Sequence, residues 1–204
     1  MSDDGLMGEL ILVRHGQTDA NAAGLLQGRI DLSLNALGRR QADDVSRSLS
    51  GLTAEGAAVI TSPLARARET AAALGAPVLI DERWIELDYG DFDGRPLGDV
   101  PSEVWVRWRS DASFVPAGGE SIASLGRRVR AACDALAATQ PESITVVVSH
   151  VSPIKAAVAW ALGVDDAVTW RMHLDQASIT RIRIGGATPA LVRFNDVNHL
   201  GGNR

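Results

Sequence analysis

The sequence predicts an α/β fold, a three-layer α/β/α sandwich around a mainly parallel central sheet. Short apolar runs rich in β-branched residues alternate along the chain with longer segments whose apolar residues recur at helical spacing. This alternation favours parallel strands with helices covering both faces of the sheet. No repeat, linker or low-complexity tract interrupts the 204 residues. We therefore expect one domain over residues 1–204.

Six segments are predicted as strands because they are short, apolar and bounded by polar residues, Gly or Pro. The last two flank the stretch 185–189, whose Gly-Gly-Ala-Thr-Pro sequence is typical of a hairpin connection. The predicted strands are Glu9–Val13, Ala57–Ile60, Val78–Ile80, Ile144–Val148, Ala177–Ile184 and Ala190–Phe194.

Helices are predicted between these strands from apolar residues three and four positions apart. Gly51 and Gly163 are expected to end two of them, and Pro63 to occupy the first turn of another. The charged stretch 81–98 is expected to be a loop. The predicted helices are Thr18–Gly24 (a short turn), Asn35–Leu49, Pro63–Leu74, Glu103–Arg109, Ser121–Thr139 and Pro153–Leu162.

Composition and charge exclude several classes of protein. The net charge is −5 without a long run of like charges, so we expect no nucleic-acid partner. The acidic stretch Ser2–Asp4 and the short apolar run after it are not typical of a secretory signal, so we expect none, and no segment approaches the roughly 18 apolar residues of a membrane span. Cys133 is the lone cysteine, and the four histidines lie far apart. We therefore expect a cytoplasmic protein with no membrane association, no metal and no cofactor.

Three predicted strands end in residues suited to chemistry. Arg14 and His15 follow the first strand, Ser62 and Arg66 follow the second, and His150 follows the strand at Ile144–Val148. Ligands bind at the carboxyl ends of strands in open α/β sheets, and here those ends share one side. Such a cationic cluster requires an anion, and the arginine fork matches phosphate oxygens. The neighbouring cations should also favour neutral, nucleophilic imidazole. The sequence therefore predicts a phosphate site.

Five motifs occur in a characteristic order. Together they resemble the signature of the histidine phosphatase (phosphoglycerate mutase-like) superfamily, which implies the phosphoglycerate mutase-like form of the predicted sandwich. The motifs are Arg14–Thr18 followed by Asn21, Ser62–Ala67 followed by Thr70, Glu86–Gly94, Pro116–Ser121 and Val148–His150.

The resemblance implies a covalent phosphohistidine mechanism. His15 would attack phosphorus and carry the phosphoryl group. Arg14, Arg66 and His150 would surround its oxygens and stabilise the transition state. Glu86 would protonate the leaving oxygen and then help to activate the water that cleaves the phosphoenzyme.

The resemblance also implies the substrate class. Asn21, Gln27 and Gly28 match positions that line the substrate phosphate in the family. We expect a metal-independent phosphatase, a phosphoric monoester hydrolase, that acts on a small phosphorylated metabolite. Dimers are common among members, which makes a homodimer one assembly available to this chain.

Two alternatives stay open. One is a cofactor-dependent phosphoglycerate mutase, although such members are longer and carry an adjacent arginine pair where this chain has only Arg95, Arg107 and Arg109 within 87–115. The other is a catalytically silent phosphate-binding or regulatory module. It rests on Val151, which stands where the family usually has Gly and would narrow the pocket or shift the ring of His150.

Four further residues have no assigned chemistry. Trp105 and Trp108, three apart on one helix face, fit either the mouth of the site or a core-facing aromatic stripe. His173 and His199 are expected to be structural or surface residues.

Overall fold

A computed structural model describes residues 8–202 of the chain. Its six strands form one sheet in the order β3-β2-β4-β1-β5-β6. The strands are β1 Glu9–Arg14, β2 Ala58–Thr61, β3 Val78–Ile80, β4 Ile144–Ser149, β5 Ile179–Arg183 and β6 Ala190–Asp196.

The sheet is mainly parallel, as predicted. β1 pairs with β4, β4 with β2, and β2 with β3 in parallel, whereas β5 runs antiparallel to β1 and β6 antiparallel to β5. The register between β1 and β4 sets Arg14 opposite Ser149. The residues that follow these strands, His15 and His150, are therefore delivered side by side.

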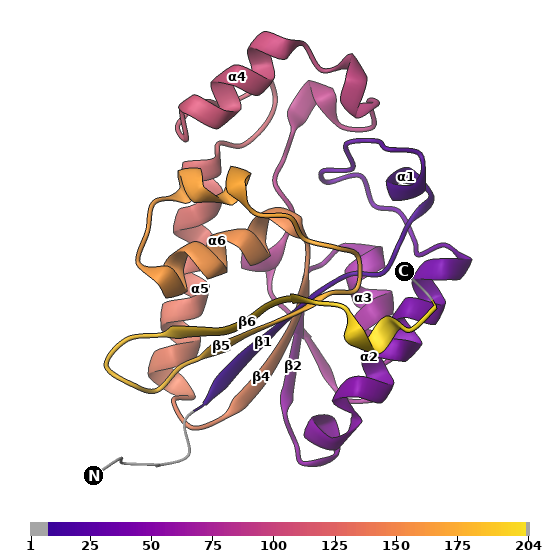
Figure 1. Cartoon of the computed structure of the whole chain (residues 1–204), viewed down its shortest axis with the longest axis vertical. Coiled ribbons are helices and arrows are strands. Elements are labelled where there is room, and N and C mark those ends of the chain that lie inside the picture. Colours follow the sequence, from indigo (N-terminus) through magenta and orange to yellow (C-terminus); the bar gives the residue numbers. More distant parts are fainter. Residues whose placement is uncertain (1–7, 203–204) are drawn as a thin grey trace.

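Helices cover both faces of this sheet (Figure 1), which gives three layers. Leu10 and Leu12 of β1 pack in the cluster that holds residues of α5 and α6, while Ile11 and Val13 pack with residues of α2 and α3. This alternation follows from the two-residue period of a strand. The helices are α1 Asp19–Ala22, α2 Ala36–Ala54, α3 Ala65–Ala72, α4 Ser102–Ser110, α5 Ile122–Thr139 and α6 Val151–Leu162.

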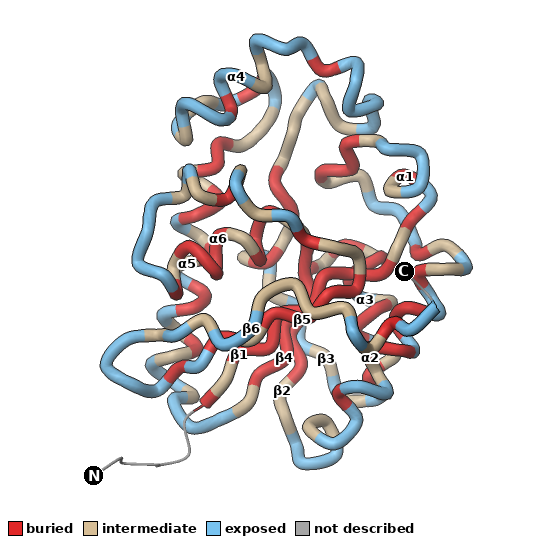
Figure 2. Tube along the Cα trace, viewed as in Figure 1, coloured by how far each residue is buried: buried red, intermediate tan, exposed pale blue. Residues whose placement is uncertain are grey.

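Buried residues concentrate in the sheet and on the inward faces of these helices, while the loops that carry the chain around them are largely exposed (Figure 2). Among residues 8–202, no helix is both long enough and apolar enough to cross a membrane.

Two predicted helix boundaries are wrong. Gly51 does not end α2, which continues to Ala54. A single glycine inside a helix costs only about 1 kcal/mol, and half-buried Leu52 packs against the core beyond it. Pro63 lies before α3, which begins at Ala65. The backbone N–H of Ala65 donates to Asp31 Oδ1 at 2.6 Å, so a distant loop caps this helix.

Other boundaries lie close to the predictions. Gly163 ends α6 in the left-handed conformation, with φ 64°, as expected. α6 begins at Val151, two residues earlier than predicted, which places Pro153 in its first turn. The predicted loop at 81–98 contains two single 3-10 turns, and a third, Leu97–Asp99, crosses its end. A further 3-10 segment, Asp166–Arg171, had no predicted counterpart.

Candidate active site

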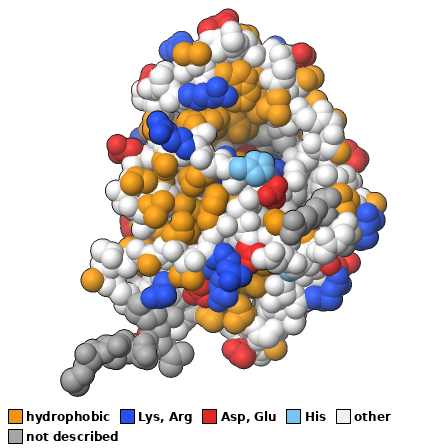
Figure 3. All heavy atoms as spheres, viewed as in Figure 1, with side chains coloured by type: hydrophobic (Ala, Val, Ile, Leu, Met, Phe, Trp, Pro, Cys, Tyr) orange, Lys and Arg blue, Asp and Glu red, His pale blue; other side chains and the backbone are white. Residues whose placement is uncertain are grey.

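A cavity of about 320 Å³ opens at the carboxyl ends of the parallel strands. It is visible as a hollow in the face shown in Figure 3, with a histidine at its rim. Seven of the eight predicted site residues line it, and the eighth, His150, lies behind His15 with the two ring centroids 5.1 Å apart. The seven are Arg14, His15, Asn21, Gln27, Gly28, Arg66 and Glu86.

His15 is held in one orientation by two neighbours. Its Nδ1 lies 2.7 Å from the carbonyl oxygen of Gly16, and Nε of Arg66 lies 3.3 Å from its Nε2. A carbonyl only accepts and a guanidinium only donates, so Nδ1 carries the proton and Nε2 keeps its lone pair. The Gly16 turn is tight: a Cβ there would lie 2.3 Å from the carbonyl oxygen of Gly38. His15 therefore presents an unprotonated Nε2 beside Arg66.

Both imidazoles are kept neutral. Burial lowers the pKa of His15 well below its ordinary value, and the nearby charges of Arg66 and Arg14 lower it further. The pKa of His150 is lowered for the same reasons, by burial first and then by Arg66, His15 and Arg14. Neutral imidazole is the nucleophilic form.

Arg14 and Arg66 donate hydrogen bonds to backbone carbonyls around the cavity, and each has N–H groups that make no such bond. Arg66 donates to the carbonyls of Gly28 and Ile30, at 2.7 Å each. Arg14 donates to the carbonyl of Leu174 at 2.5 Å, while its buried Nε has no partner among residues 8–202. Burial lowers the pKa of each guanidinium to about 10, so both stay cationic at neutral pH.

His150 has a partner to which the sequence reading assigned no role. Its Nε2 lies 2.7 Å from Oγ of Ser62, and the N–H of Leu64 donates to that same hydroxyl at 3.4 Å. Since Ser62 accepts from the backbone, its hydroxyl proton is available for Nε2 of His150. The opposite ring atom, Nδ1, is buried without a partner among the described residues. It would then carry the proton and could donate it to an anion.

Glu86 is buried, and backbone donors orient its carboxylate. Oε1 accepts from the N–H of Leu87 at 2.7 Å and from the N–H of Ser152 at 3.2 Å. Ser152 is the second residue of α6, so the same helix start that follows His150 also fixes the acid. The start of α6 therefore positions both His150 and the carboxylate of Glu86.

A cluster of charged residues behind Glu86 holds its backbone. The carbonyl of Glu86 accepts from Arg29 Nε at 3.4 Å and from an Nη of Arg128 at 3.2 Å. Glu120 pairs with both arginines, at 3.1 and 3.0 Å. We call Glu120, Arg29 and Arg128 the Glu86 bracket. Glu120 lies in the fourth sequence motif, but sequence reasoning assigned it no role.

Asn21 and Gln27 contact the buried hydroxyl of Thr18, and Gly28 follows Gln27 in the chain. Thr18 caps α1 together with Asn21, and Nε2 of Gln27 donates to the Thr18 hydroxyl at 3.0 Å. Gly28 has φ 43°, and a Cβ there would lie 1.8 Å from Asp93, so the turn requires glycine. Asn21, Gln27 and Gly28 all line the cavity, as do Val151 and Lys155 of α6.

Val151 lines the cavity as the first residue of α6. Its φ is not positive, so the backbone here does not require glycine. The valine side chain occupies part of the wall, while His150 keeps its bond to Ser62.

The aromatic pair on α4 lies outside the cavity lining. Trp108 is buried, with its ring 5.2 Å from that of Trp105 and 5.6 Å from that of Tyr89. The pair belongs to a small core beneath α4, which favours the core-stripe interpretation. His199 is half-buried and hydrogen-bonded to the carbonyl of Ala177, whereas exposed His173 lines the cavity rim.

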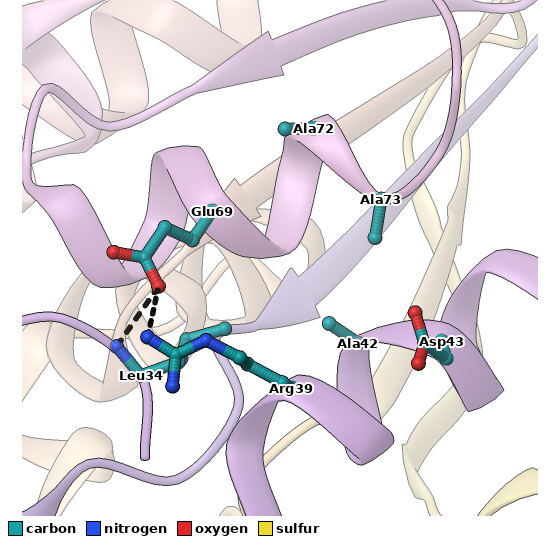
Figure 4. A pocket seen from close by; sticks show the side chains of 7 residues that line it. All are labelled: Leu34, Arg39, Ala42, Asp43, Glu69, Ala72 and Ala73. Carbon is teal, nitrogen blue, oxygen red and sulfur yellow. Dashed lines mark hydrogen bonds and ion pairs between the residues drawn. The ribbon is translucent and has the colours of Figure 1, made fainter. Parts of the chain in front are cut away.

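A second depression, of about 460 Å³, lies between α2 and α3 (Figure 4). Arg39 and Glu69 pair across it at 3.8 Å, and Glu69 also accepts from the N–H of Leu34 at 3.1 Å. The remaining wall includes three alanines, and none of the predicted site residues lines it. The chemistry-bearing side chains gather in the first cavity.

Comparison with known proteins agrees with this geometry. The family model described as histidine phosphatase superfamily (branch 1) matches residues 10–197. A bifunctional protein of Mycobacterium tuberculosis is 37% identical over 162 residues, 75% of this chain and 44% of that protein. A probable phosphoglycerate mutase of Yersinia enterocolitica is 35% identical over 168 residues, 76% of this chain and 75% of the relative.

A solved structure of a mutant phosphoserine phosphatase from Entamoeba histolytica, in complex with phosphoserine, superimposes with a TM-score of 0.87 at 28% identity. The match covers 95% of this chain and all of that one. The match thus spans less than half the length of the mycobacterial relative and the whole of the solved phosphatase. By the family model and the order of its site residues, the chain belongs to the histidine phosphatase superfamily.

Proposed function

We propose that this chain hydrolyses a small phosphomonoester through a phosphohistidine on Nε2 of His15. In the first step Nε2 attacks phosphorus, the P–N bond forms as the P–O bond breaks, and Glu86 gives its proton to the leaving oxygen. In the second step water attacks phosphorus and passes a proton to Glu86 as the P–N bond breaks. Inorganic phosphate leaves, and both residues return to their starting states.

One observation carries this proposal. The Nδ1 proton of His15 is committed to the carbonyl of Gly16, so Nε2 carries the lone pair. That lone pair accepts a long bond of 3.3 Å from Nε of Arg66, which a phosphoryl oxygen would take over as Nε2 attacks. A structural histidine gains nothing from two buried arginines that lower its pKa, whereas a nucleophile gains the unprotonated state.

The surrounding donors suit the charge that develops in the transition state. Nε of Arg14 and Nδ1 of His150 are buried without protein partners among the described residues, and Arg66 keeps two N–H groups beyond its three bonds. We assign these donors to the phosphoryl oxygens. Asn21, Gln27 and Gly28, which line the same cavity, would lie around the same phosphoryl group.

Mutase activity is the second candidate because a probable phosphoglycerate mutase is among the relatives. Mutases of the family carry an arginine pair in the part of the chain that corresponds to residues 87–115, but the arginines found here lie outside the cavity. The guanidinium of Arg107 lies 4.1 Å from the ring centre of Phe114, and that of Arg109 lies 5.7 Å from that of Trp105. Neither lines the cavity, which favours hydrolysis.

The test uses the purified chain with a panel of phosphomonoesters, followed by released phosphate, with EDTA present to check independence from metal. We expect turnover, and its loss in His15→Ala. Conversion of 3-phosphoglycerate to 2-phosphoglycerate without phosphate release would instead establish a mutase. Binding of phosphate with no turnover of any ester would establish the silent module.

The proposal also covers the size of the substrate, the location of the protein and its assembly. A small phosphorylated metabolite as substrate fits the cavity volume of about 320 Å³. We further propose a cytoplasmic location, a single catalytic domain over 1–204 and a homodimer. Light scattering of the purified chain measures the mass of the assembly, and cell fractionation measures the location.

A further inference from the structure

Arg14 is bonded to a peptide group that a second side chain holds from the opposite side. Nη1 of Arg14 donates to the carbonyl of Leu174 at 2.5 Å. The N–H of that same peptide group belongs to Asp175, and it donates to Oδ1 of Asn195 at 2.8 Å. The C=O and the N–H of a trans peptide point in opposite directions. Asn195 therefore fixes, from behind, the carbonyl that Arg14 contacts.

The side chains of Asn195 and Asp175 also bond to each other. Nδ2 of Asn195 donates to Oδ2 of Asp175 at 2.8 Å, and Nε2 of His173 lies 3.0 Å from Oδ1 of the same carboxylate. An amide oxygen only accepts and its nitrogen only donates, so these bonds fix the orientation of the Asn195 amide. Burial raises the pKa of Asp175, but the hydrogen bonds from His173 and Asn195 outweigh burial and hold that pKa below its ordinary value. Burial lowers the pKa of Arg14, and the charges of Glu86 and Asp175 oppose that shift.

Asn195 has a backbone conformation that few side chains adopt. Its φ is 53°, and within residues 8–202 Ala177 is the only other non-glycine residue with a positive φ. The pairing of β5 with β6 shifts register between Ile179 and Arg181, where β6 carries one extra residue, and Asn195 lies in this β-bulge. The N–H of Asn195 donates to the buried hydroxyl of Thr180 at 3.2 Å. A bulge changes the direction of a side chain, and here it turns the amide toward the loop that precedes β5.

The loop that receives this amide is also bonded to the backbone of the nucleophile segment. The N–H of Ala177 donates to the carbonyl of His15 at 3.1 Å. The N–H of Arg14 donates to the carbonyl of Ser178 at the same distance. Residues with a strained, positive φ persist where the surrounding contacts enforce them, and they cluster at functional sites. Both such residues here, Ala177 and Asn195, hold the segment that carries the nucleophile.

We infer that Asn195 is a positioning residue for Arg14, which it orients through the peptide group that carries the Leu174 carbonyl. This inference rests on the proposed function, which assigns Arg14 to the phosphoryl oxygens. A guanidinium is planar, so a bond at Nη1 sets the direction of its other N–H groups. One of these, Nε, has no partner among residues 8–202 and is thereby oriented for a phosphoryl oxygen before substrate binds.

The kinetic test removes the amide and keeps the backbone. Asn195→Gly retains the positive φ, since glycine adopts it readily. We expect kcat to fall about tenfold and KM to rise about threefold, because contacts to the phosphoryl oxygens count most in the transition state. Asn198→Gly, at an exposed position three residues later, is the matched control and should keep both constants within about twofold. Wild-type constants in Asn195→Gly would overturn the inference.

Coupling to Arg14 separates positioning from general damage. In an Arg14→Lys background, Asn195→Gly should lower kcat by less than about twofold, because an ammonium has no planar fork for the carbonyl to direct. An asparagine with a merely structural role would cause the same fold loss in both backgrounds, since the effects of independent sites add. Equal losses would therefore reject the inference. Urea unfolding of the four proteins verifies that each is folded under the assay conditions.

An exchange of side chains gives a second route if Asn195→Gly does not fold. Asn195→Asp alone places two carboxylates against each other, so kcat should fall by more than about tenfold. Adding Asp175→Asn restores one donor and one acceptor with their roles exchanged, and an oxygen at position 195 still accepts from the N–H of residue 175. We expect kcat to return to within about threefold of wild type. A lack of recovery would mean that the two side chains do not act as a pair.

A binding measurement separates this inference from the proposed function. Inorganic phosphate is titrated calorimetrically into wild type, Asn195→Gly and Asn198→Gly, which requires no turnover. We expect a Kd about threefold higher in Asn195→Gly alone, because one charge-assisted contact is misplaced. That result, with no turnover of any ester in wild type, would uphold the positioning role and reject the phosphatase. Turnover in wild type, with phosphate affinity and kcat unchanged in Asn195→Gly, would do the reverse.

Discussion

Nε of Arg66 donates a hydrogen bond to Nε2 of His15 across 3.3 Å. The same guanidinium is anchored by the carbonyls of Gly28 and Ile30, so its position is set before any substrate arrives. A cation beside a nucleophile lowers the proton affinity of the imidazole and provides donors for the phosphoryl oxygens. The nucleophile His15 and the cation Arg66 are therefore held in a fixed position relative to each other.

The first prediction concerns this pair. Arg66→Lys keeps the charge but loses the fork that reaches the histidine and both carbonyls at once, so we expect kcat to fall about 10²–10³-fold. Arg68→Lys, an exposed change on the same helix, should keep kcat within twofold. Steady-state kinetics on the best substrate from the panel compare the two. A full-rate Arg66→Lys enzyme would argue against the pairing.

The second prediction is a pH dependence of stability. In the folded chain His15 and His150 have pKa values well below the ordinary 6.5, so below pH 6.5 the unfolded state binds more protons. Stability must therefore fall as the pH drops through 6.5 toward the folded values. The loss should be roughly 1 kcal/mol per histidine between pH 6.5 and 5.5.

Urea unfolding at the two pH values tests this, with wild type compared against the double variant His15→Gln, His150→Gln. We expect the pH-induced loss of unfolding free energy to be smaller in the double variant by roughly 2 kcal/mol. Equal losses in both proteins would mean that the two imidazoles are not held neutral.

The third prediction concerns the Glu86 bracket. Glu120→Gln weakens the pairing with Arg29 and Arg128, which hold the carbonyl of Glu86, so we expect a poorly placed acid and a kcat about tenfold lower on alkyl phosphates. Hydrolysis of p-nitrophenyl phosphate should change little, because its leaving group hardly needs a proton.

That difference between leaving groups separates positioning from general damage. Glu103→Gln, at an exposed site on α4, is the control and should leave both rates unchanged. An equal fall on alkyl and aryl substrates in Glu120→Gln would assign the bracket to stability alone.

The fourth prediction concerns Val151. Because its backbone is ordinary helix, Val151→Gly should lower the unfolding free energy by about 1 kcal/mol and change kcat/KM only a few-fold. Thermal unfolding and kinetics of the two proteins measure both effects. A glycine variant more than a hundredfold faster than wild type would show that the valine blocks the site, as the silent-module alternative requires.

The sequence correctly predicted that residues at the strand ends meet in one place. Arg14, His15 and His150 directly follow buried strands, and parallel pairing then dictates that they meet. Gly163 ended α6 as expected because an open position in the left-handed conformation favours glycine.

Contacts between residues far apart in the sequence could not be predicted. Asp31 caps α3, and Glu120 reaches Arg29 across 91 positions, through contacts that no local pattern encodes. The partnership of Ser62 with His150 likewise depends on how β2 and β4 pair. Such contacts follow from the assembled fold, since each partner alone is an ordinary loop residue.

The phosphoenzyme tests the central claim most directly. Rapid acid-free quenching after mixing wild type with a ³²P-labelled substrate should trap one acid-labile phosphoryl group per chain, and peptide mapping should place it on His15. ³¹P NMR of the denatured phosphoprotein should show attachment at Nε2, because Nδ1 is committed to the carbonyl of Gly16. Phosphate attached to Nδ1, or turnover with no phosphohistidine on the first cycle, would contradict the account.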